Sequence, residues 1–217
     1  MLTDKILIFS MKLFLASEAK HPESIKKLEQ FIGGSLKDKS IAYIPTAANG
    51  EFFGAWKGGE SIKVAMSLGA SVETVELENL VFENPVERLK DKDIIWVAGG
   101  MSGYLLYWIR RVRLDKVLPE LLERGSLYVG SSAGSMICAK TQYSAEWYIG
   151  EPEPGCSLIP GLGLVDFEIY PHYEEAVLSE IEKRWTKGKL CLLKDGDVVT
   201  IDSGNVKVLG EEKFLEK

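Results

Sequence analysis

Short runs of consecutive apolar residues alternate along the chain with segments whose apolar residues recur at helical spacing. The apolar runs predict buried strands at 11–17, 40–45, 72–77, 93–98 and 127–129. The helical spacing predicts helices at 25–32, 60–68, 104–112 and 115–124. Strands that are apolar throughout and are separated by helices are typical of a parallel sheet covered by helices on both faces.

The pattern changes in the last third of the chain. Residues 141–163 are rich in Gly, Pro and Glu and have no clear period, which indicates a long functional loop. Beyond this loop the sequence predicts apolar strands at 164–170 and 190–193, a helix at 174–185, and a hairpin-like end of a mixed sheet at 198–201 and 206–209. No repeat or linker is evident, so we expect one α/β domain over residues 1–217 with antiparallel strands at its C-terminal end. Residues 1–10 would be an extra edge strand, an N-terminal extension or an upstream start.

Composition narrows the classes of partner. A net charge of −6 and a pI near 5.2, with no basic stripe, argue against nucleic acid. No apolar run approaches the roughly 18 residues of a membrane span, and no signal peptide is evident. Cys138, Cys156 and Cys191 show no C-x-x-C spacing and are interpreted as reduced thiols of a cytoplasmic protein. With only two histidines, far apart, the sequence predicts neither a metal site nor a cofactor.

The segment Gly130-Ser131-Ser132-Ala133-Gly134 lies between a predicted strand and a helix that starts with small residues. This G-x-S-x-G pattern, in that context, matches a nucleophile elbow. The glycines allow a sharp turn that leaves the hydroxyl of Ser132 exposed. The amide of Ala133 would then point to the position where an oxyanion develops.

A serine nucleophile needs a base, and His172 is the better of the two candidates. It follows an apolar strand, and the loops beyond the carboxyl ends of parallel strands form the active-site edge of such sheets. The alternative is a half-buried histidine bonded to backbone, while His21 lies before a proline at the start of a helix and is interpreted as a capping or surface residue. Gly99-Gly100 ends the most apolar strand and could supply a second oxyanion donor, or could be a turn shaped only for packing.

Residue type alone does not single out the acid that would orient the histidine, because most surface carboxylates are merely solvated. The candidates between the serine and the histidine are Glu146, Glu151, Glu153, Asp166 and Glu168.

Four segments, Ile44-Pro45-Thr46-Ala47, Ala98-Gly99-Gly100-Met101, Gly130–Gly134 and Tyr170-Pro171-His172-Tyr173, occur in this order along the chain. Together they resemble the peptidase E (aspartyl dipeptidase) family of serine peptidases, relatives of cyanophycinase. That family shows I-P-x-A, a strand ending in G-G-G-N, the elbow G-x-S-A-G, and a later N-P-H-[FY]. With the strand pattern, the resemblance covers nearly the whole chain from Met11.

The resemblance implies a three-layer α/β sandwich of the flavodoxin-like or class I glutamine amidotransferase-like type, with a Ser–His–acid triad. It implies Ser132 as the nucleophile, His172 as the base, and the amides of Gly100 and Ala133 as oxyanion donors. No metal or other cofactor is implied.

The family's acid lies roughly fifteen residues beyond the nucleophile, which falls near Glu146, with Glu151 as the alternative. Met101 and Tyr170 stand where the family has asparagine and would contact the substrate. Only Lys183 and Arg184 remain as partners for an acidic substrate side chain, which counts against specificity for Asp-X peptides.

The expected function is therefore hydrolysis of short peptides, as by a dipeptidase, through an acyl-enzyme. The 141–163 loop, with Trp147 and Tyr148, would form a wall or lid, or those aromatics would be packing. The alternatives are an inactive amidotransferase-like binding module, or a hydrolase of another amide or ester such as a β-linked aspartyl polymer. A homodimer is left open, with Phe52, Phe53 and Trp56 as candidate contact residues.

Overall fold

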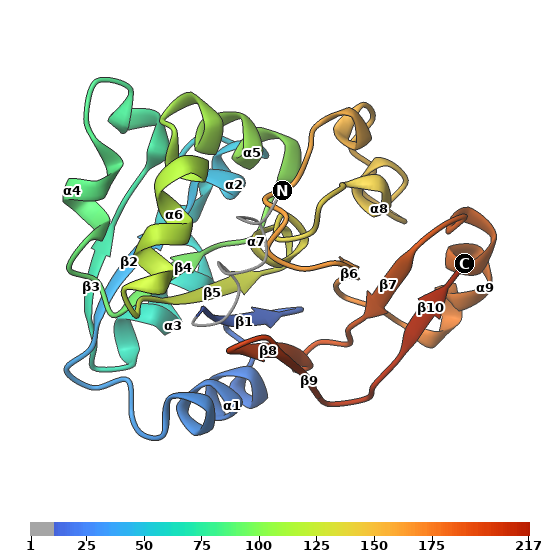
Figure 1. Cartoon of the computed structure of the whole chain (residues 1–217), viewed down its shortest axis with the longest axis horizontal. Coiled ribbons are helices and arrows are strands. Elements are labelled where there is room, and N and C mark those ends of the chain that lie inside the picture. Colours follow the sequence, from blue (N-terminus) through green and yellow to red (C-terminus); the bar gives the residue numbers. More distant parts are fainter. Residues whose placement is uncertain (1–10) are drawn as a thin grey trace, which may run out of the picture.

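A seven-stranded sheet forms the centre of the computed structural model, which describes residues 11–217 (Figure 1). Its order is β3-β2-β4-β5-β1-β8-β9. The strands are β1 Lys12–Ala16, β2 Ser40–Ile44, β3 Ser71–Thr74, β4 Ile94–Val97, β5 Leu127–Ser131, β8 Val198–Asp202 and β9 Asn205–Leu209. The first five are parallel, and β8 and β9 are antiparallel additions beside β1. This confirms the predicted mixed sheet with mostly parallel strands. The predictions for residues 1–10 lie outside the described residues.

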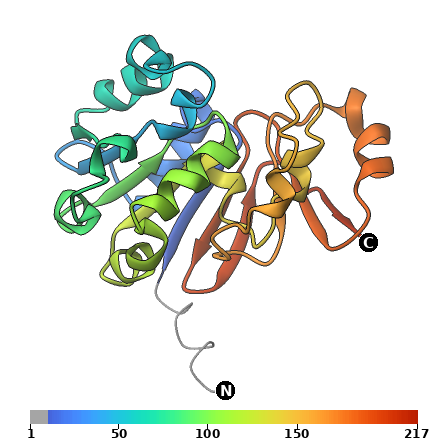
Figure 2. The ribbon, with the colours of Figure 1, turned by 90° about the horizontal axis from the view of Figure 1, so that it is seen from above.

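Helices cover both faces of this sheet (Figure 2). The side chains of β1 alternate between the two cores that these helices cover. Leu13 and Leu15 belong to the core under α5 and α6, whereas Phe14 points to the opposite core, under α1 and α3. Successive side chains of a strand point to opposite faces, so an apolar run is buried on both sides. The helices of these layers are α1 Pro22–Ile32, α3 Glu60–Ser67, α4 Pro85–Leu89, α5 Ser102–Arg111 and α6 Leu114–Glu123. The three-layer α/β architecture is therefore confirmed.

A second, three-stranded sheet lies beside the first, in the order β10-β7-β6 (Figure 1). It consists of β6 Glu168–Tyr170, β7 Lys189–Leu192 and β10 Phe214–Glu216, with α9 Leu178–Arg184 packed nearby. The strand predicted at 164–170 is shorter than expected, because the amides of Leu164 and Val165 bond to the carbonyl of Cys138 instead of a neighbouring strand. The three-residue β10 was not predicted, because so short a run has no recognisable period.

The remaining elements are short: α2 Thr46–Asn49, α7 Ala133–Met136, α8 Tyr143–Glu146, and the 3₁₀ turns η1 Ala55–Gly58, η2 Leu77–Leu80, η3 Cys156–Leu158 and η4 Glu175–Val177. The strand predicted at 72–77 ends at Thr74, and the buried Leu77 begins η2, where its amide bonds to the Thr46 hydroxyl. The helix predicted at 174–185 is η4 followed by α9.

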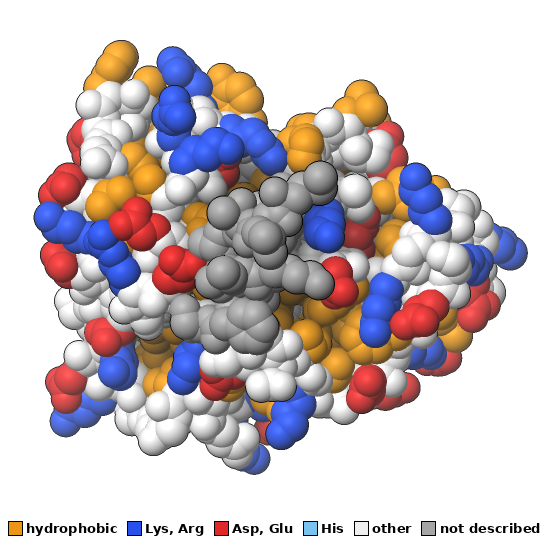
Figure 3. All heavy atoms as spheres, viewed as in Figure 1, with side chains coloured by type: hydrophobic (Ala, Val, Ile, Leu, Met, Phe, Trp, Pro, Cys, Tyr) orange, Lys and Arg blue, Asp and Glu red, His pale blue; other side chains and the backbone are white. Residues whose placement is uncertain are grey.

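Over residues 11–217, no helix combines the length and apolar character needed to cross a membrane. Cys138, Cys156 and Cys191 are buried free thiols, and burial raises the pKa of each to about 12. Basic and acidic side chains are interspersed on the face seen in Figure 3.

Candidate active site

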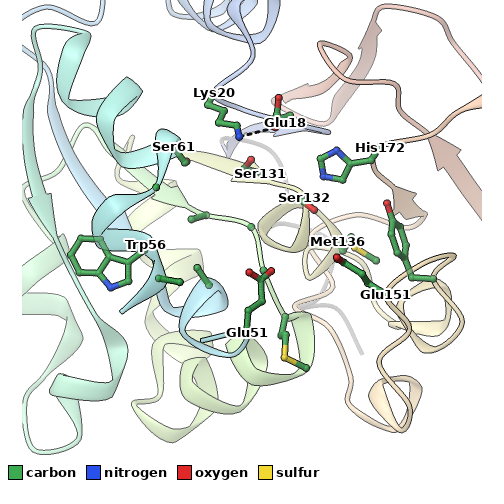
Figure 4. A pocket seen from close by; sticks show the side chains of 18 of the residues that line it. Glu18, Lys20, Glu51, Trp56, Ser61, Ser131, Ser132, Met136, Glu151 and His172 are labelled. Carbon is green, nitrogen blue, oxygen red and sulfur yellow. Dashed lines mark ion pairs between the residues drawn. The ribbon is translucent and has the colours of Figure 1, made fainter. Parts of the chain in front are cut away.

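A cavity of about 550 Å³ opens at the carboxyl ends of the parallel strands (Figure 4). Its walls include Glu18 beyond β1, Gly99 and Gly100 beyond β4, and Ser132 beyond β5. Ligands of open α/β sheets bind at this edge, because the loops that follow neighbouring strands converge there. Part of the wall comes from the 141–163 loop, including Tyr148, whereas Trp147 does not line the cavity and packs among buried side chains near β6 and β7.

Ser132 lies at the sharp turn between β5 and α7. Its backbone has φ +49° and ψ −113°, a region that non-glycine residues seldom adopt. Its amide donates to the carbonyl oxygens of Ala16 (3.2 Å) and Ser17 (2.9 Å) at the end of β1. Such strain persists only where the surroundings impose it, and it is the geometry of a nucleophile elbow.

Glycines permit close backbone approach on both sides of this serine. A Cβ atom on Gly134 would lie 2.3 Å from the carbonyl oxygen of Val97, so α7 packs directly against the end of β4. Gly100 has φ +132°, and a Cβ there would lie 2.4 Å from the backbone of Ala47. Among the described residues, neither the Gly100 amide nor the Ala133 amide is used in a turn or loop hydrogen bond.

His172 lies beside Ser132 in the cavity and comes from the loop after β6 (Figure 4). Its backbone also has a positive φ, +50°. Its Nδ1 lies 2.7 Å from Oδ1 of Asp195. This bond occupies Nδ1 and leaves Nε2 without a hydrogen bond among those of the described residues. The hydrogen bonds of the described residues do not include one between Ser132 and His172, and in many ligand-free enzymes this contact tightens only when substrate binds.

Asp195 is a functional candidate that the sequence analysis missed. It lies in the turn between β7 and β8, and its Oδ1 accepts a second hydrogen bond, of 2.9 Å, from the hydroxyl of Ser17. Asp195 follows His172 along the chain, outside the stretch between the serine and the histidine that holds the predicted candidates. No local signal marks it, because its place beside His172 depends on the antiparallel pairing of β8 with β1.

Glu146, the expected acid, makes no hydrogen bond or ion pair with His172 in the described part of the chain. Its carboxylate accepts hydrogen bonds from the amides of Gly155 (2.9 Å) and Ser157 (3.0 Å). These amides lower the pKa of Glu146 and show that it ties down the loop that follows α8.

The other carboxylates considered are also placed without contact to the histidine. Glu168 is buried and accepts from the amides of Tyr143 (3.0 Å) and Ser144 (2.7 Å). Glu151 lines the cavity, and Asp166 does not.

The two residues expected to contact substrate have different placements. Met101 lines the cavity and is 37% exposed. Tyr170 is buried in the core between the three-stranded sheet and α9, where it stacks on Trp147 and Tyr148, and it does not line the cavity. This position does not fit the expectation that Tyr170 contacts the substrate. Tyr148 instead forms part of the cavity wall, and its hydroxyl donates a 2.7 Å hydrogen bond to the carbonyl of Pro171.

The cavity is acidic. Five carboxylates line it, namely Glu18, Glu51, Glu60, Glu151 and Glu153, whereas Lys20 is the one Lys or Arg among its described lining residues. The ion pairs of the cavity within residues 11–217 join Lys20 to Glu18 (3.1 Å) and Glu60 (3.7 Å), and none uses Glu51 or Glu151. The Glu18 contact, with a smaller effect of Glu60, raises the pKa of Lys20.

The surroundings of Glu51 disfavour its negative charge, whereas those of Glu153 favour it. Partial burial raises the pKa of Glu51, and the charges of Glu151 and Glu153 raise it further. Glu153 accepts 2.8 Å hydrogen bonds from the amides of Ser102 and Gly103 at the start of α5, where a helix favours negative charge.

The basic residues considered for binding an acidic substrate do not line the cavity. Arg184 of α9 bonds to Glu180 (2.8 Å) and to the carbonyl oxygen of Trp147 (3.0 Å). Lys183 pairs with the same Glu180 at 3.8 Å.

Comparison with known proteins shows which family the chain resembles. Among curated relatives, an uncharacterized peptidase of Listeria monocytogenes is 29% identical over 175 residues, covering 79% of this chain and 82% of the relative. A peptidase E of Nostoc is 26% identical over 201 residues, covering 86% of this chain and 78% of the relative.

Two solved structures share the fold. A protein of Listeria monocytogenes provisionally described as peptidase E aligns with a TM-score of 0.74 at 24% identity, covering 92% of this chain and 98% of its own. A peptidase from an acI-B1 Actinobacterium aligns with a TM-score of 0.68 at 19% identity, covering 95% and 94%. Residues 13–209 match the sequence profile of peptidase family S51, which confirms the resemblance seen in the sequence. The chain therefore belongs to peptidase family S51 and is a serine-type peptidase.

Proposed function

We propose that the chain hydrolyses short peptides through an acyl-enzyme on Ser132, with His172 as the base and Asp195 as the residue that orients the base. The observation that carries this proposal is a single cavity in which a serine at a strained elbow lies beside a histidine whose Nδ1 is 2.7 Å from a carboxylate. Asp195 replaces Glu146 in this assignment.

In the proposed reaction, Nε2 of His172 takes the proton of Ser132 as its Oγ attacks the substrate carbonyl. Asp195 accepts from Nδ1–H, which keeps Nε2 free and stabilises the imidazolium that forms. The imidazolium then protonates the leaving amine as the peptide bond breaks. Water, activated by the same histidine, cleaves the acyl ester and restores the hydroxyl of Ser132.

The amides of Gly100 and Ala133 would bind the oxygen that becomes negative in each tetrahedral intermediate. Both are free of turn and loop hydrogen bonds in the described chain and belong to segments that flank Ser132. Removing one such donor typically costs ~3–4 kcal/mol of transition-state stabilisation.

Labelling with a fluorophosphonate probe, followed by peptide mapping, tests the proposed nucleophile. The expected result is one covalent adduct on Ser132 of the folded protein and none on the heat-denatured protein, because the hydroxyl is reactive only beside its base. An adduct on another residue, or no adduct under conditions that label a known serine peptidase, would contradict the proposal.

The charge of the cavity favours neutral or cationic substrates over aspartyl peptides. An added carboxylate would meet Glu51 and Glu151, which have no cationic partner among the described residues, whereas an ammonium group would be attracted. Like charges brought together in a partly desolvated site cost binding energy, and the cost falls as salt screens it.

We expect kcat/KM for Lys-Leu or Ala-Leu to exceed that for Asp-Leu by about 10-fold or more at neutral pH and low salt. This ratio of kcat/KM values should become smaller in a Glu51→Gln/Glu151→Gln double variant. It should stay the same in the control variant Glu123→Gln, because Glu123 is an exposed residue of α6. The ratio should also become smaller in acid, because the raised pKa of Glu51 means that this carboxylate loses its charge at a higher pH than an ordinary glutamate. Faster cleavage of Asp-Leu by the wild type would overturn this preference.

A further inference from the structure

We propose that Ser17 is a positioning residue that holds the nucleophile, the base and the acid in their mutual geometry. The inference rests on the proposed function, because it concerns the same three residues. Ser17 lies directly after β1 and is fully buried, with 0% of its surface exposed.

The Ser17 hydroxyl bridges two segments of the site. Its Oγ donates to Oδ1 of Asp195 at 2.9 Å and accepts from the backbone amide of His172 at 2.7 Å. One hydroxyl has one proton to donate, so both directions of its hydrogen bonding are used on residues of the proposed triad. The same Oδ1 accepts from Ser17 and contacts Nδ1 of His172, so the three groups form one connected network.

The backbone of Ser17 binds the other segments of the site. Its carbonyl oxygen accepts the amide of Ser132 at 2.9 Å, and its own amide donates to the carbonyl of Asp197 at 3.1 Å, two residues beyond the proposed acid. Each polar group of Ser17 thus contacts either a proposed catalytic residue or the turn that carries one.

Two of these contacts hold strained backbone. Ser132 and His172 both have positive φ, and the amide of each bonds to Ser17. Such conformations are unfavourable for residues other than glycine and persist only where neighbouring groups impose them. Ser17 is well placed to impose both, because it directly follows β1, which is paired on both sides, with β5 and β8.

A merely structural role would predict a different outcome from a positioning role. Removing any buried hydroxyl that is hydrogen-bonded lowers the free energy of unfolding. Loss of this one would also free the Asp195 carboxylate and the His172 backbone, and small displacements of catalytic groups slow the chemical step without weakening substrate binding.

The test compares Ser17→Ala with Ser126→Ala in the full chain, using hydrolysis of a neutral dipeptide, the rate of fluorophosphonate labelling, and thermal unfolding. Ser126 is a matched control, because its buried hydroxyl also donates a hydrogen bond, to the carbonyl oxygen of Lys92 at 2.7 Å, but it lies before β5, at the end of that strand opposite Ser132. Both substitutions leave the backbone hydrogen bonds of the serine in place.

For Ser17→Ala we expect kcat to fall about 10- to 100-fold with KM nearly unchanged, and labelling to slow in parallel. For Ser126→Ala we expect a similar loss of melting temperature and an unchanged kcat. An unchanged kcat in Ser17→Ala, or an equal loss of kcat in both variants, would overturn the inference.

A second pair keeps the inference testable if Ser17→Ala does not fold. Ser17→Thr and Ser17→Val add the same volume and differ only by a hydroxyl against a methyl group, so higher kcat in the threonine variant supports the bridge and equal kcat contradicts it. A wild type that neither hydrolyses peptides nor takes the label would contradict the proposed function, whereas an active wild type with an equally active Ser17→Ala variant would contradict this inference alone.

Discussion

Replacing Ser132 with alanine is expected to lower kcat/KM for a neutral dipeptide by about 10⁴-fold or more and to abolish fluorophosphonate labelling. The substitution removes the atom that would form the acyl-enzyme, and loss of a catalytic serine in comparable enzymes costs up to about 10⁶-fold. Steady-state kinetics on the purified variant, with circular dichroism to confirm the fold, measure the effect.

Ser131→Ala is the informative control for that result, because the elbow contains two adjacent serines. The Ser131 hydroxyl accepts a 3.0 Å hydrogen bond from the amide of Ala19, so its loss should affect stability and leave labelling of Ser132 intact. If labelling were lost in Ser131→Ala and retained in Ser132→Ala, the nucleophile would be Ser131 and the proposed assignment to Ser132 would be wrong.

Asp195→Asn is expected to lower kcat by about 10²- to 10⁴-fold with little change in fold. An asparagine keeps the shape of the side chain but loses the charge that stabilises the imidazolium, and it can favour the wrong tautomer of His172. The expected signature is a fall in kcat with a nearly unchanged KM, measured for the same dipeptide.

Glu146→Gln separates the two candidate acids. Its carboxylate bonds to the amides of Gly155 and Ser157, so this variant should keep kcat within a few-fold of the wild type. A large loss of kcat in Glu146→Gln, with Asp195→Asn nearly unaffected, would return the role of the acid to Glu146.

The elements that a local sequence pattern encodes could be predicted from the sequence. Buried parallel strands read as continuous apolar runs, and the elbow is a contiguous motif, so the sheet and the position of Ser132 followed directly. His172 and Gly100 were found by the rule that strand ends converge at one edge of the sheet, and the structure does bring both to the cavity.

The proposed acid, Asp195, could not be predicted, because its position depends on a pairing between distant segments. Asp195 reaches His172 since β8 lies antiparallel beside β1, with Val198 opposite Ala16. No local periodicity encodes which strand becomes the neighbour of β1. Glu146 has the expected sequence distance from Ser132, but the 141–163 loop folds back on itself and takes that side chain to its own amides.

The pairing of β1 with β8 has a consequence for when the site can form. The hydrogen bond from Ser17 to Asp195 spans 178 residues of sequence, and the one from His172 to Ser17 spans 155. Contacts of such range form late in folding, since closing a long loop costs entropy before any contact compensates for it. Synthesis proceeds from the N-terminus, so the elbow emerges well before its acid. A nascent chain that already contains Ser132 would remain without peptidase activity until its last strands dock beside the first.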